Sequence, residues 1–105
     1  MNDKFLSLLG MARRAGKISL GHDAAKDSAN RKKAKLIILA FDASGRLKKE
    51  FRTKAEDTHT DILFSHYTIE EISLAVGSKV GVLTVDDDGF SKKLREIYSI
   101  EHKED

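Results

Sequence analysis

The sequence predicts a three-layer α/β/α sandwich, in which a small sheet lies between two layers of helices. Helical and extended patterns alternate along the whole chain, which is typical of sandwiches of this kind. Apolar residues recur at helical spacing in several segments, and short apolar runs separate these segments. The run 36–41 is continuously apolar between Lys35 and Asp42, so we expect a central strand that helices cover on both faces.

The first part of the chain predicts two helices around a short extended segment. Apolar residues at positions i, i+3, i+4 and i+7 indicate a helix that begins after Asn2 or Asp3 and ends at Gly16. The segment 17–20 is extended, and a second helix over 21–30 has small inward residues that allow close packing. The inward positions of the two helices are Phe5, Leu8, Leu9 and Ala12, and then Ala25, Ser28 and Ala29.

The second part predicts three helices and two further strands. Thr68 and Glu71 have the spacing of a capping box, which indicates the start of a helix, and Gly77 stands where this helix should end. The other expected elements are a helix from Ser44 through Glu56, a strand at 62–64, a strand at 80–85, and a last helix with Phe90, Leu94, Ile97 and Tyr98 on one face.

Composition restricts the class of protein. The 105 residues suffice for one hydrophobic core, so we expect a single domain over residues 1–100 and a polar tail over 101–105. Because there is no cysteine, disulfides and thiolate metal sites are excluded, and a reducing compartment is compatible with the chain. No apolar run approaches the ~20 residues that a membrane helix needs, so we expect a cytoplasmic protein without membrane contact.

The net charge of +2 hides a strong asymmetry along the chain. Residues 1–54 contain 14 Lys and Arg against 5 Asp and Glu, whereas residues 55–105 contain 5 against 12. A segregation of this kind can build a basic face that collects phosphates. The alternative is that folding brings the two parts together and mixes the charges.

The start of the second helix is the first candidate binding site. Gly21, His22 and Asp23 present unpaired backbone N–H groups at the positive end of the helix dipole. Asp23 could accept from guanine amino groups or could simply cap its own helix. We expect two basic clusters to flank this start and to contact phosphates, one formed by Arg13, Arg14 and Lys17 and one by Arg31, Lys32, Lys33 and Lys35.

Patterns of catalytic and metal sites are missing from the sequence. The acidic segment 86–89 lacks the alternating positions of a calcium loop, and helix capping explains it better. The four histidines have no paired metal-ligand spacing, and neither a nucleophile elbow nor a phosphate-binding glycine loop is present. We therefore expect no enzymatic activity, no cofactor and no metal.

Four segments together resemble the ribosomal L7Ae superfamily, which also contains growth-arrest proteins. They are residues 9–17 (LGMARRAGK), 21–23 (GHD), 33–44 (KAKLIILAFDAS) and 84–93 (TVDDDGFSKK). The resemblance covers nearly the whole chain and implies an α/β/α sandwich with a four-stranded mixed sheet. It also implies binding to kink-turns, which are sharply bent RNA helices recognised mainly by shape.

The family signature at the start of the second helix is Gly-x-Asn-Glu, followed by a lysine three residues after the Glu. Gly21 matches it and Asp23 replaces the Asn, whereas Ala24 and Asp27 depart from the Glu and the lysine. The resemblance implies a second contact loop at 76–79, with Val76 and Val80 as its apolar candidates. Our expected RNA-binding residues are Lys17, Gly21, His22, Asp23, Lys26, Arg31, Lys32, Lys33, Lys35, Val76 and Lys79.

The leading hypothesis is a non-catalytic, ribosome-associated protein that recognises structured, kink-turn-like RNA, with ribosomal RNA as its partner. Ala24 and Asp27 motivate an alternative, which is a protein-interaction or dimerisation module on the same fold with weak or no RNA binding. The acidic residues Glu70, Glu71 and 86–88 would then form the surface for a protein partner or a second copy.

Overall fold

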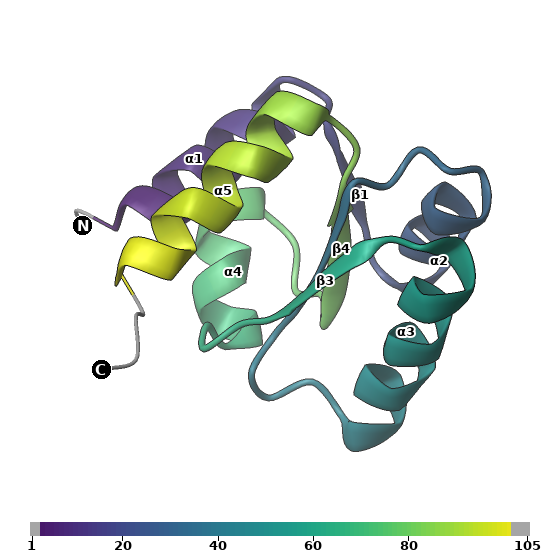
Figure 1. The fold of residues 1–105 in the computed structure, drawn as a ribbon. Coiled ribbons are helices and arrows are strands. Elements are labelled where there is room, and N and C mark those ends of the chain that lie inside the picture. The colour runs from purple at the N-terminus through teal and green to yellow at the C-terminus, as the bar shows by residue number, and fades with distance from the viewer. Residues whose placement is uncertain (1–2, 102–105) are drawn as a thin grey trace.

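The computed structural model describes residues 3–101 and confirms the α/β/α sandwich (Figure 1). Helices and strands alternate, as expected. In chain order the elements are α1 (Lys4–Arg14), β1 (Ile18–Leu20), α2 (His22–Asn30), β2 (Leu36–Leu39), α3 (Gly45–Thr58), β3 (Asp61–Phe64), α4 (Ile69–Val76), β4 (Val82–Val85) and α5 (Asp88–Glu101).

The sheet is mixed and four-stranded, with strand order β1-β4-β2-β3. β4 runs antiparallel to both of its neighbours, and β2 pairs with β3 in parallel. Ile18 and Leu36 both stand opposite Val85, so β1 and β2 begin at the same end of the sheet. The carboxyl ends of β1, β2 and β3 therefore lie together at the opposite end, where Gly21 follows β1.

Two helices cover one face of the sheet and three cover the other. α2 and α3 pack together against β1, β4, β2 and β3, whereas α1, α4 and α5 form the second layer (Figure 1). β2 and β4 are buried along their whole length, which confirms the expectation for the apolar run that begins at Leu36. The largest fully buried side chains are Phe5, Phe51, Leu9, Leu36, Ile37, Ile38, Leu39, Ile72, Leu83 and Leu94.

Most of the expected helix caps are confirmed. Asp3 accepts from the backbone N–H of Leu6 at 2.9 Å and also from the hydroxyl of Tyr67 at 2.8 Å, which ties the start of α1 to the segment before α4. Thr68 and Glu71 form both hydrogen bonds of a capping box, and Gly77 ends α4 in the left-handed region.

Two strands are shorter than expected because the chain leaves the sheet for other backbone partners. β2 ends at Leu39: the N–H of Ala40 still reaches Gly81, but the N–H of Phe41 donates to the carbonyl of Tyr67 at 2.7 Å. β4 begins only at Val82, so the two preceding residues belong to a loop.

The end of the chain differs from the expectation at its boundary. α5 includes Glu101, the first residue of the expected polar tail, and residues 102–105 lie outside the described part of the chain. Within residues 3–101, no helix is both long and apolar enough to cross a membrane.

Folding sorts the charges by layer rather than by halves of the chain. Residues 21–35 and 44–60, which contain α2 and α3, carry ten Lys and Arg against five Asp and Glu. In the other layer, α1, α4 and α5 together carry six against five. Because α1 lies beside the helices of the acidic second half, its basic residues are mixed with acidic ones, and the basic excess remains on the α2/α3 layer.

Candidate nucleic-acid interface

The start of α2 is open to a ligand. Gly21 is the N-cap, with φ 89° and ψ 173°, a region that glycine adopts far more easily than other residues. No side chain among residues 3–101 caps this helix end, so N–H groups of the first turn remain available at the positive end of the helix dipole. The alternative in which Asp23 only caps its own helix is therefore wrong.

His22 connects the start of α2 to α3. Its Nδ1 lies 3.0 Å from a carboxylate oxygen of Asp23, and its Nε2 lies 2.8 Å from a carboxylate oxygen of Glu50. These hydrogen bonds, first to Asp23 and then to Glu50, raise the pKa of His22 above its usual value of 6.5. The Asp23 carboxylate is otherwise exposed, so its remaining acceptor positions can reach a base edge.

Two segments far apart in the sequence meet at this point. A Cβ added to Gly21 would lie 3.8 Å from a methyl carbon of Val80, and the Gly21 N–H donates to the carbonyl of Val82 at 3.0 Å. We call Gly21, His22, Asp23, Lys79 and Val80 the Gly21 surface. It joins the start of α2 to the α4–β4 loop, which includes part of the second contact loop that the resemblance implied.

The residues of the expected contact loop differ in their access to a ligand. Val76 is 4% exposed and packs into the core as part of α4, so its expected role as an apolar RNA contact is wrong. Val80 is half-buried beside Gly21 and is the apolar side chain available there. Lys79 is exposed, and its ammonium lies 3.2 Å from a carboxylate oxygen of Glu70.

Most of the expected basic residues lie at the other end of the molecule. β1 and β2 start at the same end of the sheet, so Lys17 and Lys35, which precede them, lie opposite Gly21. Arg31 follows Gly21 by ten residues, and the rise of α2 places it roughly 15 Å from Gly21. The expectation that both clusters flank the start of α2 is therefore wrong, because it depended on strand directions. Lys26 is exposed in the middle of α2 and lies between the two regions.

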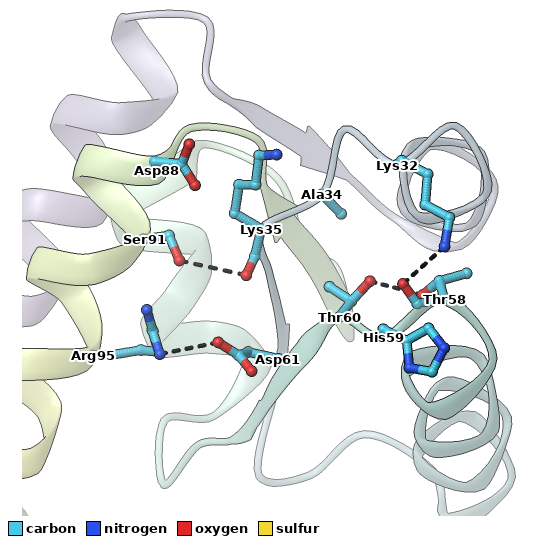
Figure 2. A pocket seen from close by; sticks show the side chains of 10 residues that line it. All are labelled: Lys32, Ala34, Lys35, Thr58, His59, Thr60, Asp61, Asp88, Ser91 and Arg95. Carbon is cyan, nitrogen blue, oxygen red and sulfur yellow. Dashed lines mark hydrogen bonds and ion pairs between the residues drawn. The ribbon is translucent and has the colours of Figure 1, made fainter.

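Two residues of the second cluster, Lys32 and Lys35, line a cavity of about 340 Å³ (Figure 2). Lys32, in the left-handed region with φ 63°, donates from its ammonium to the carbonyl of Thr58 at 3.1 Å. The Lys35 ammonium has no hydrogen bond or ion pair to any residue in the range 3–101 and is free for a ligand. Arg95 and Asp61 also line the cavity, and a guanidinium nitrogen of Arg95 lies 2.9 Å from a carboxylate oxygen of Asp61. The cavity thus offers unpaired positive charge far from the Gly21 surface.

Acidic residues of the second half are mostly occupied within the protein. Asp86 accepts from the hydroxyls of Ser19 (2.5 Å), Ser28 (2.7 Å) and Thr84 (2.8 Å). Asp87 accepts from the N–H of Phe90 at 2.8 Å, which confirms capping. Glu71 accepts a hydrogen bond in the capping box, and Glu70 pairs with Lys79. Of the five acidic residues 70, 71 and 86–88, Asp88 alone has no side-chain partner within residues 3–101. Among residues 3–101, no group of three or more His, Asp or Glu could hold a metal ion.

One residue of this region could not be found from the sequence. Glu50 is 28 positions from His22, and no local pattern marks it. Asp27, which departs from the family signature, lies 3.1 Å from the guanidinium nitrogen Nε of Arg31, so its negative charge is offset within α2.

Comparison with known proteins shows the family and the fold of this chain. The ribosomal protein L7Ae/L30e/S12e/Gadd45 family matches over residues 3–95. The RNA-binding protein YlxQ of Enterococcus faecium is 32% identical over 94 residues, which are 90% of each chain. Among solved structures, a protein of unknown function from Bacillus halodurans has a TM-score of 0.88 at 28% identity, over 93% of this chain and 99% of that chain. The 15.5kD RNA binding protein of Giardia lamblia shares the fold, with a TM-score of 0.74 at 22% identity over 95% of this chain and 89% of that chain.

A match over nearly the whole sequence thus coincides with a shared fold and with a glycine-started α2 facing the α4–β4 loop. The chain belongs to the ribosomal protein L7Ae/L30e/S12e/Gadd45 family.

Proposed function

We propose that this protein is a non-catalytic RNA-binding protein that recognises sharply bent, kink-turn-like RNA, with ribosomal RNA as its partner. The observation that carries the proposal is the approach of Val80 to Gly21 at the uncapped start of α2. This junction combines backbone donors, an exposed carboxylate and an apolar side chain. Groups of these three kinds suit phosphates, base edges and a protruding base, respectively.

Two further observations support the proposal. The α2/α3 layer has a net positive charge, which favours the binding of a polyanion to this side of the molecule. Relatives of this chain also include a protein named as RNA-binding.

Because Ala24 and Asp27 depart from the family signature, other residues have to contact the guanine and the phosphate. Ala24 has no carboxylate, so we assign the acceptor role toward guanine to Asp23, which is one residue away and exposed. Asp27 is neutralised by Arg31, and Lys26 beside it is exposed toward solvent and can meet a phosphate.

A titration with two variants tests this assignment. The protein is added to a labelled kink-turn RNA and to a matched plain duplex, and binding is followed by fluorescence anisotropy at several salt concentrations. Both Asp23→Ala and the control Asp57→Ala remove an exposed negative charge from the α2/α3 layer. Non-specific attraction alone would make both variants bind RNA more tightly.

The proposal expects opposite results for the two variants. Asp23→Ala should weaken kink-turn binding by about 5-fold or more, which is the loss of about one good base contact, whereas Asp57→Ala should bind as tightly as the wild type or more tightly. Equal binding of the wild type to kink-turn and duplex would contradict kink-turn recognition. Tighter binding by Asp23→Ala would remove Asp23 from the recognition surface.

A further inference from the structure

Two exposed phenylalanine rings on the α2/α3 side of the sheet each lie beside a cation. Phe41 is 59% exposed, and the ammonium of Lys48 is 5.5 Å from its ring centroid. Phe64 is 37% exposed, and the guanidinium of Arg52 is 5.2 Å from its ring centroid. Within residues 3–101, the other large exposed apolar side chains have no aromatic ring and lie on the opposite layer: Met11, Leu74 and Ile100.

The two aromatic–cation pairs lie next to each other. Lys48 and Arg52 are four residues apart on α3, which places them one helical turn apart on the same side. Phe64 stands beside Leu39 in the parallel ladder, and Phe41 follows Leu39 by two residues. We call Phe41, Lys48, Arg52 and Phe64 the aromatic strip; it lies at the carboxyl ends of β2 and β3, where β3 is an edge strand.

Backbone and side-chain contacts hold the Phe41 end of the strip in place. The Phe41 N–H donates to the carbonyl of Tyr67 at 2.7 Å, and the Lys48 ammonium donates to the Phe41 carbonyl at 2.6 Å. Asp42 accepts from the N–H of Ile69 at 2.8 Å, which ties the following residue to the start of α4. The ring is therefore exposed on an ordered turn, and a ligand that stacks on it pays little ordering entropy.

The strip is separate from the Gly21 surface. Gly21 and Val80 lie at the ends of β1 and β4, whereas the strip lies at the ends of β2 and β3 on the far side of α3 from Glu50, the partner of His22. A ligand on the strip would therefore not need the groups that face the start of α2.

We propose that the aromatic strip binds single-stranded RNA, with two bases stacked on Phe41 and Phe64 and with phosphates at Lys48 and Arg52. Exposed aromatic faces with adjacent cations are the combination that proteins use for unpaired nucleotides, because every base has a flat face and every linkage is anionic. The positive charge beside both rings favours this polyanion over an apolar protein segment. The inference rests on the proposed RNA-binding function, but its site is a different one.

A fluorescent base makes the stacking directly measurable. A short single-stranded oligoribonucleotide containing 2-aminopurine is titrated with the full chain at low salt, and both anisotropy and quenching of the base are recorded. Phe41→Leu and Phe64→Leu keep an apolar side chain of similar bulk but remove the aromatic face. Leu74→Ala is the matched control, because it removes an exposed apolar side chain from the opposite layer.

The proposal expects the wild type to bind and quench the probe, and each phenylalanine variant to lose about 5-fold or more in affinity together with most of the quenching. Leu74→Ala should behave as the wild type, and urea unfolding of all variants verifies that each is folded. Lack of binding by the wild type, or binding that both leucine variants retain in full, would overturn the proposal.

The same variants separate this inference from the proposed function. Binding of the oligonucleotide that depends on the phenylalanines supports the strip even if kink-turn RNA is bound no better than duplex. Kink-turn binding without any binding of the oligonucleotide refutes the strip and leaves the Gly21 surface intact.

Discussion

Replacing Asp86 should reveal how strongly its hydroxyl network stabilises the packing of β1, α2 and β4. This carboxylate follows β4 and accepts hydroxyl donors from β1, α2 and β4, so it joins the three elements that position Gly21. One oxygen, Oδ1, accepts from both Ser28 and Thr84, and the other, Oδ2, accepts from Ser19. The backbone N–H of Asp86 also donates to the backbone carbonyl of Lys17 at 2.8 Å, and this hydrogen bond does not depend on the side chain at position 86.

The cost of Asp86→Ala follows from the burial of its partners. Thr84 is 0% exposed and Ser28 is 3% exposed, so their hydroxyls would lose their acceptor where water has little access. Each buried donor left unpaired costs about 1–3 kcal/mol, and the half-buried Ser19 can turn to solvent. We expect the free energy of unfolding to fall by about 3–5 kcal/mol, a large fraction of the roughly 5–15 kcal/mol typical of a domain.

Asp86→Asn distinguishes the effect of losing the hydrogen bonds from the effect of losing the negative charge. The amide oxygen can replace Oδ1 and keep both buried hydroxyls bonded, while the amide nitrogen can donate to Ser19, whose hydroxyl rotates to accept. The free energy of unfolding then falls only because the hydrogen bonds are no longer charge-assisted, by about 1–2 kcal/mol.

Urea unfolding followed by far-UV circular dichroism measures both variants on the full chain. With a typical slope of about 1–2 kcal/mol per molar urea, Asp86→Ala should lower the midpoint by roughly 2 M. Asp88→Ala is the matched control, because Asp88 is exposed and makes no described side-chain hydrogen bond. The hydroxyl network does not stabilise the fold as argued if Asp86→Ala lowers the free energy of unfolding by less than about 1 kcal/mol. The same conclusion follows if Asp86→Ala lowers it no more than Asp86→Asn does.

Two further predictions concern the start of α2. Gly21→Ala should lower the free energy of unfolding by about 1–3 kcal/mol in the same urea assay, because φ 89° and ψ 173° strain any side chain; an unchanged midpoint would refute this. The pKa of His22 is raised in the folded protein, so raising the pH through this pKa removes the positive charge of the imidazole. The contribution of His22 to stability is therefore fully present below the usual pKa of 6.5, and it is lost above the pKa that His22 has in the folded protein. Kink-turn affinity should fall in the same direction between about pH 6 and about pH 8, and His22→Gln should flatten this profile; an equal slope in the variant would exclude His22 as the cause.

Local signals made much of the fold predictable from the sequence. A helix cap is encoded within four residues, so Asp3, Ser44 and the Thr68–Glu71 capping box were all identifiable. The layer pattern followed from the alternation of helical and extended periodicity, which is also local. Boundaries were less accurate: β2 ends earlier and β4 begins later than expected, because apolar residues continue beyond the last ladder pair, and α5 extends into the expected tail as far as Glu101.

The parts of the site that depend on strand direction could not be predicted in this way. Whether Lys17 and Lys35 lie beside Gly21 depends on which strands run parallel, and nothing near these residues encodes that choice. Val76 and Val80 look equivalent in the sequence, but Val76 is the last residue of α4 and faces the core. The resemblance pointed to the correct loop, while the exposure of each side chain required the packed structure.

The contact between Asp3 and Tyr67 has a practical consequence for attaching labels. Burial and the Asp3 hydrogen bond raise the pKa of Tyr67, and Glu101 lies close enough to contribute, so the start of α1 and the end of α5 converge on one tyrosine. Both helices belong to the layer opposite α2 and α3 (Figure 1). A fluorophore or surface tether attached to α1 or α5 would therefore lie on the side opposite the basic layer. Protein immobilised in this way should present α2 and α3 outward, which suits single-molecule tests of the proposed RNA binding.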